Sequence, residues 1–115
     1  MKTLASIVAI GVFGASLLYG HHGWTGYDES KTLKITGVIK EAGYANPHPF
    51  VKLEVDKKIW NVVLPPLILL QARGLEKDKL KPGTTATVVG YPHKQIAGEM
   101  RAERIIIGGK TTELR

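Results

Sequence analysis

The chain has 115 residues, 43% of them hydrophobic, a formal net charge of +6 and no cysteine. This length suits one small domain with a modest core. The lack of cysteine excludes disulfide bonds, thiolate metal sites and a lipoprotein anchor. The positive charge can favour anionic partners, but the lysines are scattered, so we interpret it mainly as a solvated surface.

Residues 1–20 have the features of a secretory signal peptide. One basic residue precedes an apolar stretch from Leu4 to Leu18, and small residues lie near its end. The stretch is shorter than the about 20 apolar residues that a spanning helix needs, so the sequence favours a cleaved signal over a retained membrane anchor. We expect cleavage after Gly20 and a periplasmic or secreted location for residues 21–115.

Residues 21–115 are predicted to form a single OB-like β-barrel domain with a histidine-rich N-terminal arm. The arm, His21 to Ser30, shows no clear period. After it, alternation of apolar and polar residues predicts five strands and a short final one. The predicted strands cover Thr32–Ala42, Phe50–Asp56, Ile59–Leu64, Thr84–Tyr91, Glu99–Ile107 and Thr111–Leu114, and turns are predicted at residues 56–58 and 108–109.

A short helix is predicted at Leu67–Arg73, between the third and fourth strands. Pro65-Pro66 can open it, and Gly74 can adopt the left-handed conformation that ends a helix. A five-stranded barrel with a helix at this point is the OB-fold arrangement. A small β-sandwich would account for the strands but not for the helix. The predicted fold class is therefore all-β with one short helix.

All four histidines lie outside the predicted strands, with His21 and His22 in the arm and His48 and His93 in loops. A barrel can bring its arm and two loops to one end. Imidazole without thiolate suits copper(II), zinc or nickel, and copper(II) binds most tightly. A free α-amine on His21 would add a second nitrogen and favour tetragonal copper over tetrahedral zinc. The hypothesis is a shared copper site, with zinc or no metal as alternatives.

Other residues bear on this hypothesis. His48 stands between two prolines, whose restraint on the backbone either presents the imidazole as a ligand or merely shapes a turn. Met100 offers a thioether, but its alternation places it in the core. Trp24 and Tyr27 are expected to fold the arm onto the barrel. Asp28 and its neighbour Glu29 could support the histidines or act as general bases, but the sequence favours the interpretation that they are solvated.

Catalytic motifs are poor in this sequence. It contains no Gly-x-Ser-x-Gly, no His-Glu-x-x-His and no Gly-rich phosphate loop. A terminal His21 resembles the copper site of oxidative polysaccharide monooxygenases, but so small a domain lacks their broad binding surface. We therefore expect binding rather than catalysis. No nucleic-acid partner is expected, because Phe50 and Trp60 are better explained as core residues than as stacking platforms.

Several short elements carry a family resemblance. They are His21-His22-Gly23-Trp24, Tyr27-Asp28, Leu33 to Ile39, Asn46-Pro47-His48, Trp60, Leu80-Lys81-Pro82-Gly83 and Gly90-Tyr91-Pro92. Together they resemble the DUF6152 family of small exported bacterial proteins of unknown function. The resemblance implies a signal peptide, a β-rich domain and recurring His-His and Asn-Pro-His elements, which here are His21, His22 and His48. It implies no biochemical activity.

The expected function is that of an exported protein that binds a transition metal, copper first, for sequestration, delivery or electron transfer. Delivery would require a periplasmic or membrane partner protein. The alternative is a non-metal binding module whose barrel face or loops capture a small ligand or a partner protein. The sequence does not set the oligomeric state.

Overall fold

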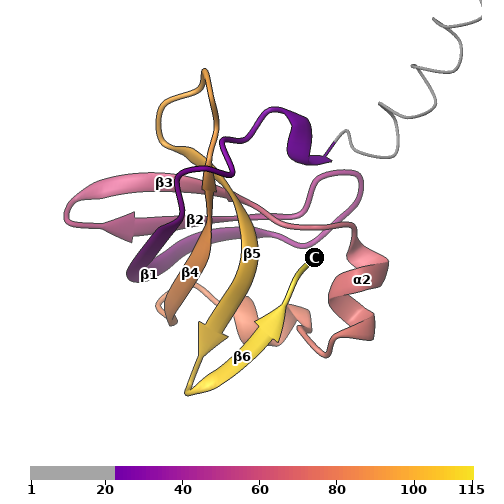
Figure 1. Ribbon diagram of the computed structural model, residues 1–115. Coiled ribbons are helices and arrows are strands. Elements are labelled where there is room, and N and C mark those ends of the chain that lie inside the picture. The colour runs from indigo at the N-terminus through magenta and orange to yellow at the C-terminus, as the bar shows by residue number, and fades with distance from the viewer. Residues whose placement is uncertain (1–22) are drawn as a thin grey trace, which may run out of the picture.

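The computed structural model describes residues 23–115, which form one six-stranded sheet wrapped into a barrel (Figure 1). The strands are β1 (Leu33–Gly43), β2 (Phe50–Val55), β3 (Lys58–Val63), β4 (Thr85–Pro92), β5 (Glu99–Ile107) and β6 (Lys110–Glu113). Two short helices, α2 (Leu67–Ala72) and the 3-10 helix η1 (Lys77–Leu80), connect β3 to β4. The predicted signal peptide, residues 1–20, and the histidines 21 and 22 lie outside the described residues.

Parallel pairing of β3 with β5 closes the barrel. The other strand pairs are antiparallel, in the order β3-β2-β1-β4-β5-β6. At the closure Asn61 lies opposite Glu99, and Val63 lies opposite Arg101. Closure removes the edges that β3 and β5 would otherwise expose. The predicted five-stranded OB-like barrel, with its helix between the third and fourth strands, is confirmed.

The alternating apolar residues fill the barrel as predicted. Ile39, Leu53, Val62 and Met100 are fully buried, so the core position expected for Met100 is confirmed. Leu70 of α2 joins the same core. Burial of an aliphatic side chain of this size contributes about 1.5–3 kcal/mol, so the inward faces of the strands supply most of the stabilisation.

Two strands, β3 and β6, begin one residue earlier than predicted, directly after two-residue hairpin turns. Asp56 and Lys57, with φ of 50° and 67°, form the turn alone, so β3 begins at Lys58 rather than at the residue after it. Gly108 and Gly109, with φ of 58° and 78°, likewise make a two-residue turn and move β6 forward by one residue.

The segment between β3 and β4 holds one element that the sequence did not predict. α2 begins at Leu67 as expected and ends at Ala72, and Gly74 has the expected left-handed φ of 80°. This element is η1. It was not predicted because its charged residues show no apolar period, and Leu80 is its only residue that is buried in the core. Within residues 23–115 no helix is long and apolar enough to cross a membrane.

Candidate functional site

A groove of about 650 Å³ lies between the barrel and residues 23–30, the part of the N-terminal arm that the structure describes. Figure 1 shows the arm, in indigo, crossing the same end of the barrel as the orange β4–β5 loop. The groove is lined by Gly23, Thr25, Gly26, Tyr27, His48, Asn61, Val63, His93, Glu99 and Arg101. The lining thus combines the β3–β5 closure with the β1–β2 and β4–β5 loops. In OB-folds these two loops flank the surface that binds ligands.

Trp24 is the first anchor of the arm. Its ring lies 4.7 Å from the guanidinium carbon of Arg101 and 4.1 Å from that of Arg115. Its edge also meets the Tyr91 ring, with the two centroids 6.0 Å apart. Cation–π contacts of this kind contribute about 0.5–1 kcal/mol each at exposed sites. The expectation that Trp24 folds the arm onto the barrel is confirmed.

Tyr27 is the second anchor. It is only 9% exposed, and its hydroxyl donates a 2.6 Å hydrogen bond to Oε2 of Glu99. Burial, together with this carboxylate, raises the pKa of the Tyr27 hydroxyl far above its ordinary value, so the hydroxyl stays a donor. Its ring meets His93 edge to face at 5.0 Å, and their backbones form a β-bridge. Tyr27 therefore fixes both Glu99 and the β4–β5 loop.

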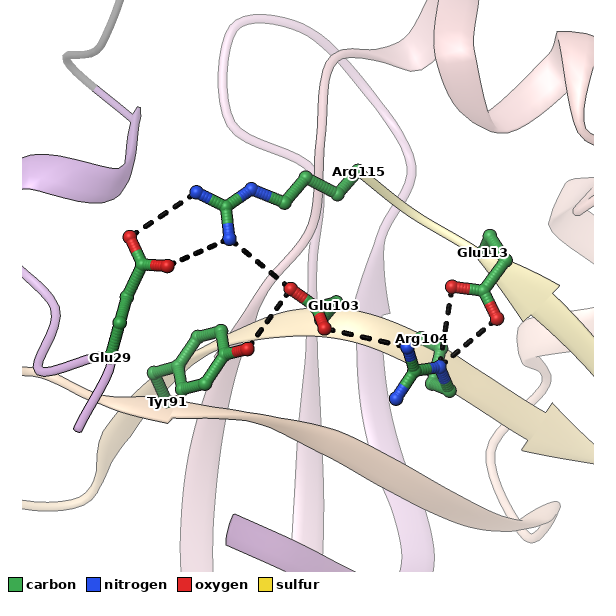
Figure 2. Close-up of polar contacts among 6 residues, drawn as sticks. All are labelled: Glu29, Tyr91, Glu103, Arg104, Glu113 and Arg115. Carbon is green, nitrogen blue, oxygen red and sulfur yellow. Dashed lines mark hydrogen bonds and ion pairs between the residues drawn. The ribbon is translucent and has the colours of Figure 1, made fainter. Parts of the chain in front are cut away.

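A charge cluster around Arg115 ties the arm to the last residue of the chain (Figure 2). Arg115 Nη1 lies 2.8 Å from Oε1 of Glu29 and 3.2 Å from Oε1 of Glu103, which also accepts a 3.0 Å hydrogen bond from Tyr91. The hydrogen bond from Arg115 holds the pKa of Glu29 below its usual range. Glu29 is exposed to solvent, which was one of the two expectations from the sequence, and its ion pair with Arg115 also holds the arm to the barrel.

Arg101 lies in the groove without an ion-pair partner among the described residues. Its side chain is half-buried, and its Nε is buried without a hydrogen-bond acceptor. Within the described part of the chain no carboxylate lies within ion-pair distance of it. Burial lowers the pKa of the guanidinium, which nevertheless stays charged. Gly90 lets β4 approach closely here, since a Cβ at Gly90 would collide with the Arg101 carbonyl oxygen.

His93 is held by its own loop. Its Nδ1 accepts hydrogen bonds of 3.0 Å from the backbone N–H groups of Gln95 and Ile96. A neutral ring that accepts at Nδ1 carries its proton on Nε2. Nε2 points to the arm, where a Cβ on Gly26 would lie 3.0 Å away. In this tautomer His93 offers the groove an N–H donor, and the metal-ligand role predicted for it stays a prediction.

His48 differs from His93 because it is exposed and makes no hydrogen bond with any residue of 23–115. Its imidazole is free to act as a ligand. The structure thus brings two of the four predicted metal ligands to one groove, while His21 and His22 lie outside the described residues. Among residues 23–115 no three His, Asp or Glu side chains are grouped to hold a metal ion.

Sequence reasoning missed Asn61, Glu99 and Arg101, which supply most of the polar lining from the barrel. They occupy outward positions of alternating strands, which is the pattern of a solvated face. The sequence held one signal for them. Glu99, Arg101 and Glu103 place three charges on one face of a predicted strand, and a predicted arm could cover that face.

Comparisons with known proteins bear on the fold and the family. A family model described as "Family of unknown function (DUF6152)" matches residues 10–101. A search of curated proteins found no match. Among solved structures, a chain in the crystal structure of a complex of TiaS with a tRNA and ATP is similar, with a TM-score of 0.54 and 16% identity over 76% of this chain. The present chain covers only 19% of that one, so the likeness supports the fold alone.

Proposed function

Because the chain belongs to the DUF6152 family, whose function is unknown, the groove must supply the argument, and we propose that the exported protein captures copper(II) there. His48 would be the barrel's ligand, with His21 and His22 as those of the arm. One observation carries the proposal: His48 lines the same groove as Gly23, the residue that directly follows His22. A histidine at the opposite end of the barrel would be out of reach.

The donor set suits copper(II). Cleavage after Gly20 would leave an α-amine and an imidazole on His21, which can chelate one ion, and the free imidazole of His48 can add a third nitrogen. Nitrogen donors in a tetragonal arrangement favour copper(II), which also stands highest in the affinity order of divalent metals. Zinc would bind the same donors more weakly.

The groove lining contains no sulfur ligand, and this favours copper sequestration or delivery over electron transfer. Soft thiolate and thioether ligands favour copper(I). The sequence has no cysteine, and Met100 is fully buried in the core. A site that favours copper(II) alone suits capture and handover better than electron transfer, which must stabilise both oxidation states. We therefore propose sequestration of copper or its delivery to a periplasmic or membrane partner.

Copper titration of matched proteins tests this proposal. The parent begins at His21, and the variants are an extension by one residue before His21, His48→Ala and His93→Asn. The extension removes the chelating amine and His48→Ala removes the barrel ligand, so each should weaken copper binding at least about tenfold, as losses at metal sites do. His93→Asn is the control, because an Asn oxygen can accept the hydrogen bonds that now reach Nδ1.

The pH dependence adds a second readout. An α-amine has a reference pKa of about 7.7–8.0 and must lose its proton to bind copper. Affinity of the parent should therefore fall steeply from about pH 8 to 5, and less steeply in the extended protein. Equal affinities in the parent, the extended protein and His48→Ala would overturn the copper proposal.

A further inference from the structure

Arg101 poses a problem that the copper proposal does not address. A guanidinium is permanently charged, and burying a charged group without a partner is costly. The other arginines of β5 and the C-terminus are paired: Arg104 Nε lies 3.0 Å from Glu113 and Arg115 Nη1 lies 2.8 Å from Glu29. Within residues 23–115 the guanidinium of Arg101 instead faces the Trp24 ring, at 4.7 Å. Nε is itself buried, so an external anion in the groove would reach this charge through Nη1 and Nη2 of the guanidinium.

The other polar groups of the groove complement such a ligand. His93 presents its Nε2–H donor, and Asn61 lines the same wall of the barrel. Glu99 has one carboxylate oxygen held by Tyr27, while its Oε1 accepts no hydrogen bond within residues 23–115. The groove therefore combines donors for an anion with one acceptor for a hydroxyl or ammonium group of the same molecule.

The part of the arm that lies over the guanidinium of Arg101 is the backbone of Gly23, which has no side chain. A Cβ on Gly23 would lie 2.7 Å from Nη1 of Arg101, so a larger residue there would require the Arg101 side chain to shift. The volume of about 650 Å³ exceeds what a single ion fills. Ligand pockets for small organic molecules begin at about 300 Å³. The size indicates a small organic molecule rather than a bare inorganic anion.

We propose that the groove binds a small organic carboxylate whose carboxylate group accepts hydrogen bonds from Arg101. The guanidinium presents parallel N–H groups that match the two oxygens of a carboxylate. The Glu99 carboxylate in the same groove disfavours a phosphate dianion, because each additional negative charge on the ligand adds repulsion. A hydroxyl next to the carboxylate would donate to Oε1 of Glu99, so a hydroxy acid should bind more tightly than a plain acid.

Calorimetric titration of the protein that begins at His21 with small anions tests this site independently of copper. Metal is first removed on a chelating resin, and chloride keeps the ionic strength constant. The probes are lactate, acetate and inorganic phosphate. The test variant is Arg101→Met, which removes the charge but keeps a long unbranched side chain. Arg104→Met is the matched control, because it removes the same charge from the same strand outside the groove.

The expected order of affinity is lactate, then acetate, then phosphate. Arg101→Met should bind lactate at least about tenfold more weakly, in line with the loss of charged hydrogen bonds, while Arg104→Met stays within about twofold of the parent. Arg101→Lys should also weaken binding, because it keeps the charge but loses the paired N–H groups. Circular dichroism verifies that each variant is folded.

Three results would overturn the proposal. They are the lack of saturable lactate binding by the parent, equal weakening by Arg104→Met and Arg101→Met, and tighter binding of phosphate than of lactate. The first rules out the site, the second shows a general charge effect, and the third refutes the carboxylate assignment. None of them bears on copper, since the protein is free of metal.

Discussion

Strand β5 passes through two regions that treat charge in opposite ways. In the charge cluster around Arg115 (Figure 2), the arginines meet carboxylates, as in the 2.8 Å contact with Glu29. In the groove, on the same strand, Arg101 meets no carboxylate among residues 23–115. Among residues 23–115 the cluster pairs its charges, and the groove leaves Arg101 without a carboxylate.

The difference separates what holds the arm from what can hold a ligand. Ion pairs at exposed positions contribute little each, about 0–1 kcal/mol, yet several of them in the cluster fix the arm to β5 and to the C-terminal residue. In the groove, the guanidinium of Arg101 has no carboxylate partner among residues 23–115. This lowers the stability of the fold and leaves the guanidinium able to bind a ligand. Charged groups that are left without a partner are expected at functional sites.

Tyr27→Phe should have the largest effect on stability among these tests. The change leaves Oε2 of Glu99 without its 2.6 Å donor and should lower the free energy of unfolding by about 2 kcal/mol, as expected for a hydrogen bond to a charged group. Tyr44→Phe is the control, since it loses a bond to the neutral Leu75 carbonyl and should cost about 1 kcal/mol. Urea unfolding measures both. Equal losses would mean that Glu99 does not depend on Tyr27.

Arg101→Met and Arg115→Met should shift stability in opposite directions. Arg101→Met relieves an unsatisfied buried donor and loses one Trp24 contact, for a net gain of up to about 1 kcal/mol in the free energy of unfolding. Arg115→Met loses its bonds to Glu29 and Glu103 as well as its contact with Trp24, for a loss of about 1 kcal/mol. Thermal unfolding without ligand or metal compares the two. A loss in both variants would erase the distinction between the regions.

Alkaline titration should show a smaller effect that spans both regions. Burial raises the pKa values of Tyr27, Tyr44 and Tyr91. A raised pKa means that stability is complete below the unfolded value, about 10, and is lost as pH rises beyond it. Ultraviolet absorbance should show that these three tyrosines ionise at a higher pH than a free tyrosine does. The ionisation at the highest pH should be missing from Tyr27→Phe. Ionisation of all tyrosines near their reference pKa would contradict the burial of the arm.

Much of the fold follows from local patterns. Alternation marks which residues of each strand face inward, and it placed Met100 in the core. The helix after β3 selected the OB arrangement over a sandwich. The turn at residues 108–109 was predicted to the residue. The pairing of β3 with β5 and the two-residue length of the turn at residues 56–57 were not predicted, because they depend on backbone geometry that tight packing sets.

The groove was harder to predict than the barrel. The loop positions of His48 and His93 and the docking of Trp24 are visible in the sequence. Arg101 and Glu99 are not, because outward residues of a strand normally meet water. They become a site only when Tyr27, 72 positions before Glu99, folds over them. No local pattern carries that contact, and the tautomer of His93 likewise depends on how its loop closes.

Paramagnetic broadening by copper(II) tests the central claim most directly, namely that the groove end of the barrel is where the protein captures its ligand. Copper(II) is added below one equivalent to the isotope-labelled protein that begins at His21. The account predicts that amide signals of residues 23–27 and of His48 are lost first, while those of η1, outside the groove lining, persist. Loss of the η1 signals first, or uniform broadening over the chain, would contradict it.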